Sequence, residues 1–369
     1  MKLEINNEKL KRAVLKLRNS LPDVSVNPIL EHILFEVKDS VLTLKSTNNL
    51  VSIIWTTPID IKENFSFTIH GETLCGLVSS FKQDTVIFDY NPETRDVTLS
   101  YGKYILEAVS GNTSNYPVID IPEKLKEFKL PNNFLTMLKS VYFSISNDAT
   151  KPDLNSLCID INKDSSGKFS LVSTDRIRLS CASTNTEFDK SKAIRFILPK
   201  SSVSEIIKME PTLLLYDENL SFIYFKIEGE QETYFLRSVL TNFIYPDIYA
   251  YLNNPYKDEQ TIKVNKNDLI TSLKRIRLTT EKTNKIGTLE FKEDKAVVSS
   301  LNSMNKSKEE ISLILESIEK KPNNFNMNID HVLEYLSQEI ADTVNFRVID
   351  NKCIIFDKEN YRHVLSINS

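Results

Sequence analysis

The sequence contains only seven glycines, four cysteines and four histidines among its 369 residues. The one glycine pair with phosphate-loop spacing, Gly71 and Gly76, precedes Leu77-Val78 instead of the Lys-Ser/Thr that would bind phosphate. The cysteines form no Cys-x-x-Cys pair, and the histidines show no His-x-x-x-His spacing. We therefore expect no metal, no cofactor and no disulfide framework.

Long apolar runs are also missing: no stretch of 18 apolar residues and no signal-peptide core occurs, and 26% of the residues are charged. Ser173-Thr174-Asp175 has the residue types of a catalytic cluster, but no Gly-x-Ser-x-Gly elbow and no nearby base accompany it. We therefore expect a cytoplasmic protein without a membrane role and without catalytic residues.

A short phrase of three apolar residues occurs six times at nearly even spacing. Its copies are Leu3-Ile5-Leu10, Phe67-Ile69-Leu74, Phe128-Leu130-Leu135, Phe196-Leu198-Val203, Ile262-Val264-Leu269 and Phe325-Met327-Val332. With 41% apolar residues, the bare pattern would match on the order of 25 positions by chance. The spacing is the stronger signal, because 129 residues separate Phe67 from Phe196, Phe196 from Phe325, and Tyr116 from Tyr245. A period kept across the chain predicts copied structural units.

Each copy has the pattern of a half-buried strand that leads into an amphipathic helix, because the alternating apolar residues precede a helix-start signal. Examples of that signal are Asn6-Asn7, Asn265 and Asn328. Further strand-like segments with polar turns follow each helix, which favours an α+β fold with antiparallel sheets. Two copies for each domain predict three similar domains, with bounds 1–121, 127–250 and 260–369.

Positive charge is concentrated in two of the six predicted helices, although the whole chain carries −4. The window 8–18 has a net charge of +4 and the window 266–277 has +3, whereas the sixth helix contributes −3 through Asp330, Glu334 and Glu339. A solvated helix surface would explain either cationic helix alone. Their equivalent places in the first and third domains favour contact with the phosphates of duplex DNA.

Several segments along the whole chain resemble the bacterial DNA polymerase III beta subunit, the sliding clamp of replication. These segments are Met1-Lys2-Leu3, Asn27-Pro28-Ile29-Leu30, the stretch from Leu171 to Ser180 with Thr174-Asp175 and Arg178-Leu179, and Tyr245-Pro246-Asp247. The resemblance implies the DNA clamp fold, in which a head-to-tail homodimer closes into a ring with antiparallel sheets outside and two helices per domain lining the hole. It also implies a non-catalytic processivity factor that encircles double-stranded DNA without sequence preference.

The family binds short hydrophobic peptide motifs of the polymerase III alpha subunit, the clamp loader and repair proteins in one groove. By matched position, the resemblance implies a groove formed by Leu154, Thr174, Arg178, Leu179, Pro246, Asn328, His331, Val364 and Leu365. For the subunit interface it implies that the strand 104–109, with Tyr104 and Leu106, meets the partner region that includes Leu273 and Leu278. From charge we expect DNA contacts from Lys9, Arg12, Lys16, Lys151, Lys274, Arg275 and Arg277.

The chain departs from the family pattern at several of these places. Ile177 replaces a histidine, Val24 replaces a common arginine, and the chain ends in Ser366-Ile367-Asn368-Ser369 instead of a Met-Pro-Met-Arg type sequence. The alternative from another class is a monomeric six-unit repeat protein with an internal ligand pocket.

Overall fold

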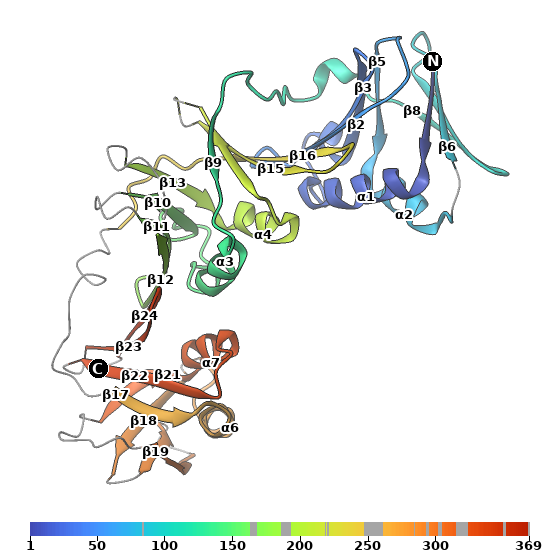
Figure 1. The fold of residues 1–369 in the computed structure, drawn as a ribbon. Coiled ribbons are helices and arrows are strands. Elements are labelled where there is room, and N and C mark those ends of the chain that lie inside the picture. Colours follow the sequence, from blue (N-terminus) through green and yellow to red (C-terminus); the bar gives the residue numbers. More distant parts are fainter. Residues whose placement is uncertain are drawn as a thin grey trace. The chain divides into compact units, whose positions relative to one another are not determined.

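The computed structural model describes residues 1–82, 85–162, 168–185, 193–217, 219, 221–246, 261–283, 285–292, 295–301, 305–314, 324–349 and 352–367. Three successive stretches of the chain have the same order of elements: strand, helix, four strands, helix and three strands (Figure 1). The six strand–helix phrases predicted from the sequence are all present, at β1-α1, β5-α2, β9-α3, β13-α4, β17-α6 and β21-α7.

The bounds of the elements follow that order in each stretch. The first contains β1 (Lys2–Asn6), α1 (Asn7–Leu17), β2 (His32–Lys38), β3 (Val41–Thr47), β4 (Val51–Pro58), β5 (Phe65–His70), α2 (Gly71–Ser80), β6 (Thr85–Tyr90), β7 (Asp96–Tyr101) and β8 (Tyr104–Val109). The second contains β9 (Lys126–Lys129), α3 (Phe134–Tyr142), β10 (Ser156–Ile161), β11 (Lys168–Thr174), β12 (Arg178–Asn185), β13 (Ile194–Pro199), α4 (Lys200–Met209), β14 (Leu213–Tyr216), β15 (Phe222–Glu228) and β16 (Thr233–Val239). The third contains β17 (Thr261–Asn265), α6 (Lys266–Arg277), β18 (Ile286–Phe291), β19 (Lys295–Ser300), β20 (Lys308–Ser312), β21 (Phe325–Asn328), α7 (Ile329–Gln338), β22 (Thr343–Ile349), β23 (Cys353–Lys358) and β24 (Tyr361–Ser366).

Asparagine caps start three of the helices as the sequence predicted. The Asn6 side chain accepts from the Lys9 backbone N–H at the start of α1, and Asn265 and Asn328 do the same for the first turns of α6 and α7. A side-chain acceptor at this position satisfies a backbone donor that has no partner within the helix. In α2 the cap is His70 and not Gly71, which is the first helical residue.

All strand pairs in the described residues are antiparallel, and they form four sheets. Two sheets have four strands, in the orders β1-β6-β7-β8 and β20-β19-β18-β21. The other two have eight, in the orders β5-β2-β3-β4-β16-β15-β14-β9 and β13-β10-β11-β12-β24-β23-β22-β17. Each eight-stranded sheet therefore joins two successive stretches edge to edge, through β4 with β16 and through β12 with β24. The fold is α+β with three similar stretches, as expected.

The chain separates into two compact units. Unit 1 comprises residues 1–132 and 201–240, and unit 2 comprises residues 133–200 and 241–369. The predicted middle domain, 127–250, is thus shared between the units, because half of its strands continue the sheet of the first stretch and half that of the third. The segment 247–260, which holds the predicted boundary to the third domain, lies outside the described residues, so the three domain bounds stay predictions.

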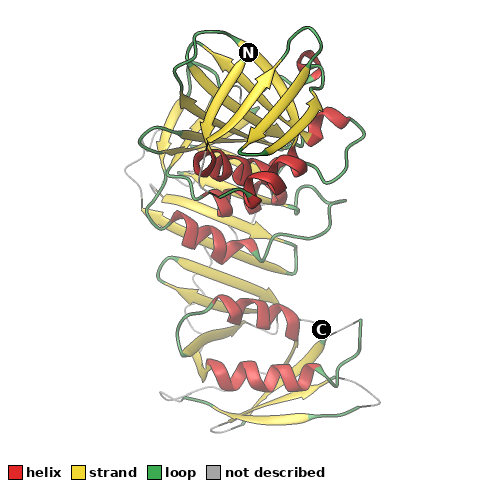
Figure 2. Ribbon diagram, turned by 90° about the vertical axis from the view of Figure 1, so that its right-hand side faces the viewer, coloured by secondary structure: helices red, strands yellow, loops and turns green. Residues whose placement is uncertain are grey.

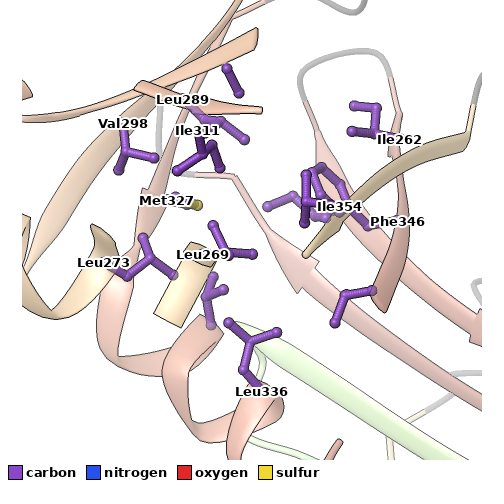
Figure 3. Packing of buried hydrophobic residues seen from close by; sticks show 14 of the residues in the cluster. Ile262, Leu269, Leu273, Leu289, Val298, Ile311, Met327, Leu336, Phe346 and Ile354 are labelled. Atoms are coloured by element: carbon purple, nitrogen blue, oxygen red, sulfur yellow. The ribbon is translucent and has the colours of Figure 1, made fainter. Parts of the chain in front are cut away.

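The apolar residues of the third stretch form one core beneath its helices. In unit 2, α6 and α7 contact each other (Figure 2). Figure 3 shows Leu269, Leu273, Met327 and Phe346 pointing into the same packed interior. The apolar residues of the fifth and sixth sequence phrases are therefore core residues.

Candidate functional surfaces

Helix α1 presents cations on one face and buries the other. Leu10, Val14 and Leu17 are buried and form the apolar face of this amphipathic helix. Two of the cations also contact the strand β16 side of unit 1: an Arg12 guanidinium nitrogen lies 3.8 Å from Glu232 Oε1, and Lys16 Nζ lies 4.3 Å from the centre of the Tyr234 ring. A cation over an aromatic face is held by the ring quadrupole. These two side chains thus link α1 to the joined sheet as well as presenting charge.

The cations of α6 differ in their surroundings. Lys274 is exposed. An Arg275 Nη1 nitrogen lies 2.7 Å from Glu309 Oε1 on β20, and Arg277 pairs with Asp330 on α7. The hydrogen bond and the charge of Asp330 raise the pKa of Arg277. Two of the three predicted DNA contacts on α6 are therefore partly neutralised within unit 2.

The acidic residues of the sixth helix have cationic partners. Asp330 pairs with Arg277, Glu334 pairs with Arg178, and Glu339 Oε1 accepts from Lys358 Nζ at 2.7 Å. The charge of −3 counted in the sequence therefore does not act as an isolated acidic surface. Long-range pairing of this kind cannot be read from a count along one helix.

Lys9 on α1 is half-buried, and Lys151, another predicted DNA contact, lies between α3 and β10. Its Nζ is 3.1 Å from Asp148 Oδ2, and both side chains are exposed. Hydrogen bonds from Thr150 and then from Lys151 lower the pKa of the Asp148 carboxyl. An exposed ion pair of this kind stabilises the fold little and leaves the cation accessible.

Four residues of the predicted peptide groove, Arg178, Leu179, Val364 and Leu365, are paired across the junction of β12 and β24 in unit 2. Leu179 and Val364 are directly opposite each other across that junction. Both belong to one apolar cluster on the sheet, together with Cys158, Val172, Cys181, Ile197, Tyr245, Ile349 and Ile355. Pro246 follows Tyr245, whose hydroxyl donates to the Val172 carbonyl at 3.1 Å. An apolar floor beside a strand junction suits the apolar side chains of a short peptide.

Strand alternation divides the predicted groove residues between two faces. Leu365 is fully buried in the core under α6 and α7, whereas its neighbour Val364 belongs to the groove cluster. Arg178 likewise points away from Leu179, because its guanidinium lies 5.6 Å from the Phe143 ring centre and pairs with Glu334. Neighbouring residues of a strand point to opposite faces. Arg178 and Leu365 therefore lie on the helix-covered face of the junction, opposite the apolar cluster.

Arg178 is the centre of a polar cluster that joins α7 to the turn before β12. Its Nε donates to Asp175 Oδ2 at 2.8 Å, and its backbone carbonyl accepts from Thr174 Oγ1 at 2.7 Å. The Arg178 side chain is only 6% exposed, so its charge depends on these carboxylates. Leu154, also buried, donates its backbone N–H to Lys151.

His331 and Asn328 mark the start of α7 at this cluster. Asn328 Oδ1 accepts from the backbone N–H groups of Asp330 and His331, at 2.9 and 3.3 Å. Burial, and next the charge of Arg178, lower the pKa of His331. Its buried Nδ1 has no hydrogen-bond partner among the described residues.

Most residues of the apolar cluster at the β12·β24 junction were not identified from the sequence. Cys158, Val172, Ile349 and Ile355 lie on four different strands, and only the strand order brings them to one face. Tyr245 was accessible to sequence analysis, because it is one of the markers that repeat after 129 residues.

In the predicted subunit interface the strand β8 is exposed, whereas Leu273 is buried. In β8, Tyr104 and Ile105 are exposed and Leu106 is half-buried, and β8 pairs with β7 on one side only within the described chain. Leu278 is 81% exposed at the end of α6. Leu273 is fully buried in the core of its own stretch (Figure 3), so its side chain cannot contact a partner, contrary to our expectation. It stands four residues after Leu269, on the buried face of the same helix.

No group of three or more His, Cys, Asp or Glu side chains among the described residues could hold a metal ion. No helix in the same residues is long and apolar enough to cross a membrane.

Known proteins match this chain in sequence and in fold. Residues 1–120 match the family model of the N-terminal domain of the DNA polymerase III beta subunit, and residues 130–242 match that of its central domain. The beta sliding clamp of Helicobacter pylori is 28% identical over 306 residues, covering 77% of this chain and 76% of that protein. That of Haemophilus influenzae is 22% identical over 372 residues, covering 98% and 97%.

Solved structures show the same fold at low identity. The DNA polymerase III subunit beta from Pseudomonas aeruginosa superimposes with a TM-score of 0.88 at 15% identity, covering 100% of both chains. The DNA polymerase sliding clamp from Bacillus subtilis gives 0.87 at 17% identity, covering 100% of this chain and 99% of that chain. The two family models span well over half of the 369 residues, and the chain belongs to the bacterial DNA polymerase III beta subunit family, the beta sliding clamps.

Proposed function

We propose that two copies of this sliding clamp pair head to tail into a ring around duplex DNA and tether the replicative polymerase for processive synthesis. The observation that carries the proposal is the edge-to-edge pairing of strands from successive stretches. The fourth strand of one stretch pairs with the last strand of the next, as β4 with β16 and β12 with β24. The equivalent strands left over are β20 and β8, each at the end of a four-stranded sheet.

An unpaired edge strand is a ready site for pairing with another chain, and β8 also carries the exposed apolar side chains of Tyr104 and Ile105. Pairing of β8 with β20 of a second copy would repeat the two internal junctions, and two such contacts would close a ring. β20 lies beside α6, since Glu309 pairs with Arg275. The partner region predicted around Leu273 and Leu278 is therefore better described as β20 with the exposed Leu278.

The proposed DNA contacts come from Lys9, Arg12, Lys16, Lys151, Lys274, Arg275 and Arg277. Single Lys and Arg contacts to phosphate carry no sequence information and weaken with salt, so a ring held by them could slide. Several of these cations also contact carboxylates of their own unit, which keeps the attraction to DNA low.

The β12·β24 face is the proposed site for short hydrophobic peptide motifs of the polymerase III alpha subunit, the clamp loader and repair proteins. Leu179 and Val364 belong to the apolar cluster of this face together with Tyr245, which precedes Pro246, and the proposed site also includes Asn328 and His331 at the start of α7. Tethering through such a peptide raises the effective concentration of the polymerase at the primer end.

The proposed role is non-catalytic and cytoplasmic. The family and the matching relatives give no support to the alternative of a monomeric repeat protein with an internal ligand pocket.

The decisive experiment is retention on circular DNA. The protein is loaded onto a nicked plasmid with a clamp loader and ATP, and the complex is separated by gel filtration in high salt. A topological clamp stays on the circle and leaves when a restriction enzyme cuts the plasmid. Equal retention on circular and linear DNA would refute the proposal.

A further inference from the structure

The junction of β4 and β16 in unit 1 has an apolar cluster that corresponds to the peptide groove. Ile54 and Phe235 are directly opposite each other across this junction, as Leu179 and Val364 are across the β12·β24 junction. Ile54 belongs to one buried apolar cluster with Leu34, Tyr116 and Ile119. Phe235 packs against this cluster, as do Ile29 and Ile121. Both junctions therefore have an apolar cross-strand pair on the face that also holds a buried tyrosine.

The two tyrosines are equivalent by position and by contact. Tyr116 and Tyr245 are 129 residues apart, and proline follows each. The Tyr116 hydroxyl donates to the carbonyls of His32 and Lys45, at 3.2 and 3.0 Å, and the Tyr245 hydroxyl donates to Val172. Each tyrosine thus fixes the segment that follows β8 or β16 onto a neighbouring sheet.

At the first junction the segment after the tyrosine lies across the cluster. Ile119 is only 2% exposed, although it belongs to a segment without regular structure. The Val118 carbonyl accepts from Arg237 Nη1 at 3.4 Å, and the Asp120 carbonyl accepts from Tyr224 at 3.5 Å. Buried isoleucines and backbone carbonyls held by side-chain donors are the contacts that a bound apolar peptide would make.

We infer that the β4·β16 junction is a second peptide groove, for short apolar peptides, that the chain's own residues 117–121 occupy. The inference rests on the proposed function only in taking the β12·β24 face as the open peptide site.

The test releases the segment and supplies it in trans. The full chain carries Ile119→Ser and Ile121→Ser, and the probe is a fluorescein-labelled synthetic peptide with the sequence of residues 116–121. The matched control is Val118→Ser, because Val118 belongs to the same segment but is 78% exposed. Fluorescence anisotropy gives the number of peptides bound for each chain, and hydrogen exchange locates them.

We expect the double variant to bind one peptide more for each chain than the wild type and the Val118→Ser control. The additional peptide should protect amides of β4 and β16. If the folded double variant gains no binding site, or if protection is confined to β12 and β24, the inference is wrong.

A second variant covers the case in which the double variant does not fold. Ile119→Ala shortens the apolar side chain without adding a polar group, and we expect it to bind the additional peptide more weakly than the double variant and to exchange the amides of residues 118–121 faster than the wild type. Unchanged exchange together with no additional peptide would overturn the inference. Failure of the circular-DNA experiment would not change either result, because no measurement here uses DNA.

Discussion

Arg277 in α6 and Asp330 in α7 form an ion pair that joins the last cationic helix to the acidic one. The guanidinium donates through both Nε and Nη2, the latter at 3.3 Å from Oδ2. Both side chains are partly exposed, so the pair stabilises the fold little. Its larger effect is on the surface charge of α6, since a paired arginine attracts phosphate less than a free lysine does.

Lys274 should therefore contribute more to DNA binding than Arg277. Lys274 is exposed and enters no ion pair in the described part of the chain. We expect Lys274→Gln to reduce the slope of log K against log salt by about 1, and Arg277→Gln to reduce it by less. The measurement is fluorescence anisotropy with labelled duplex DNA between 50 and 200 mM salt.

Asp330→Asn provides the converse experiment, because it removes an acid and frees Arg277. It should strengthen DNA binding and steepen the salt dependence. Sedimentation should show that all three variants keep the oligomeric state of the wild type. If Arg277→Gln and Lys274→Gln weaken binding equally, the ion pair does not limit the DNA contact of Arg277.

Ile105 should be critical for the subunit contact. It is 62% exposed in the edge strand β8, and an aspartate there would place a charge in the proposed β8·β20 pairing. We expect Ile105→Asp to sediment as a monomer of 42.4 kDa, whereas the wild type sediments at twice that mass. The control is Val24→Asp, an equally drastic change at an exposed loop residue, which should remain dimeric. A dimeric Ile105→Asp would place the interface elsewhere.

The repeat of strand and helix was predictable because it depends on local patterns. The alternating apolar residues and the caps at Asn6, Asn265 and Asn328 lie within a few residues of the element that they specify. The burial of Leu273 follows from the same kind of local pattern, because Leu273 stands four residues after Leu269 on the buried face of α6. This burial conflicts with the role at the subunit interface that the family resemblance implied.

The strand junctions and the ion pairs were not predictable from one sequence. No local pattern indicates that β12 pairs with β24, because the paired residues Arg178 of β12 and Leu365 of β24 are far apart in the chain. Without that register, strand alternation could not assign Leu179 to the face of the sheet with the apolar cluster and Arg178 to the face covered by helices. The same limit applies to Arg277 and Asp330, which are 53 residues apart.

Leu179 should supply binding energy for peptides at the β12·β24 face. Truncation to alanine removes apolar surface worth about 1–2 kcal/mol, so peptide affinity should fall about tenfold. The measurement is fluorescence anisotropy with a labelled short peptide that carries the hydrophobic motif of the polymerase. Ile340→Ala is the control, because Ile340 is exposed beyond the end of α7 and should leave affinity unchanged. Equal affinity for Leu179→Ala and the wild type would exclude this face as the site.

His363 should make the β12·β24 junction sensitive to acid. Its ring is fully buried, Nδ1 lies 2.8 Å from Ser180 Oγ, and it stacks on Tyr335 with ring centres 5.1 Å apart. Burial, with a smaller effect of Arg178, lowers the pKa of His363 from 6.5 to about 3. The unfolded junction therefore binds the proton more readily, and stability that is fully present above pH 6.5 is lost as the pH falls toward 3.

The expected loss is about 1.4 kcal/mol for each pH unit below 6.5, or about tenfold in the opening equilibrium. Hydrogen exchange of β12 and β24 peptides, corrected for the intrinsic rate, measures it between pH 7.5 and 5. His363→Gln removes the titrating ring, so its protection should be lower at pH 7.5 but depend less on pH. The lowered pKa of His331 acts in the same direction, so the variant's remaining slope measures that contribution. If the variant and the wild type show the same slope, His363 does not carry the acid sensitivity of this junction.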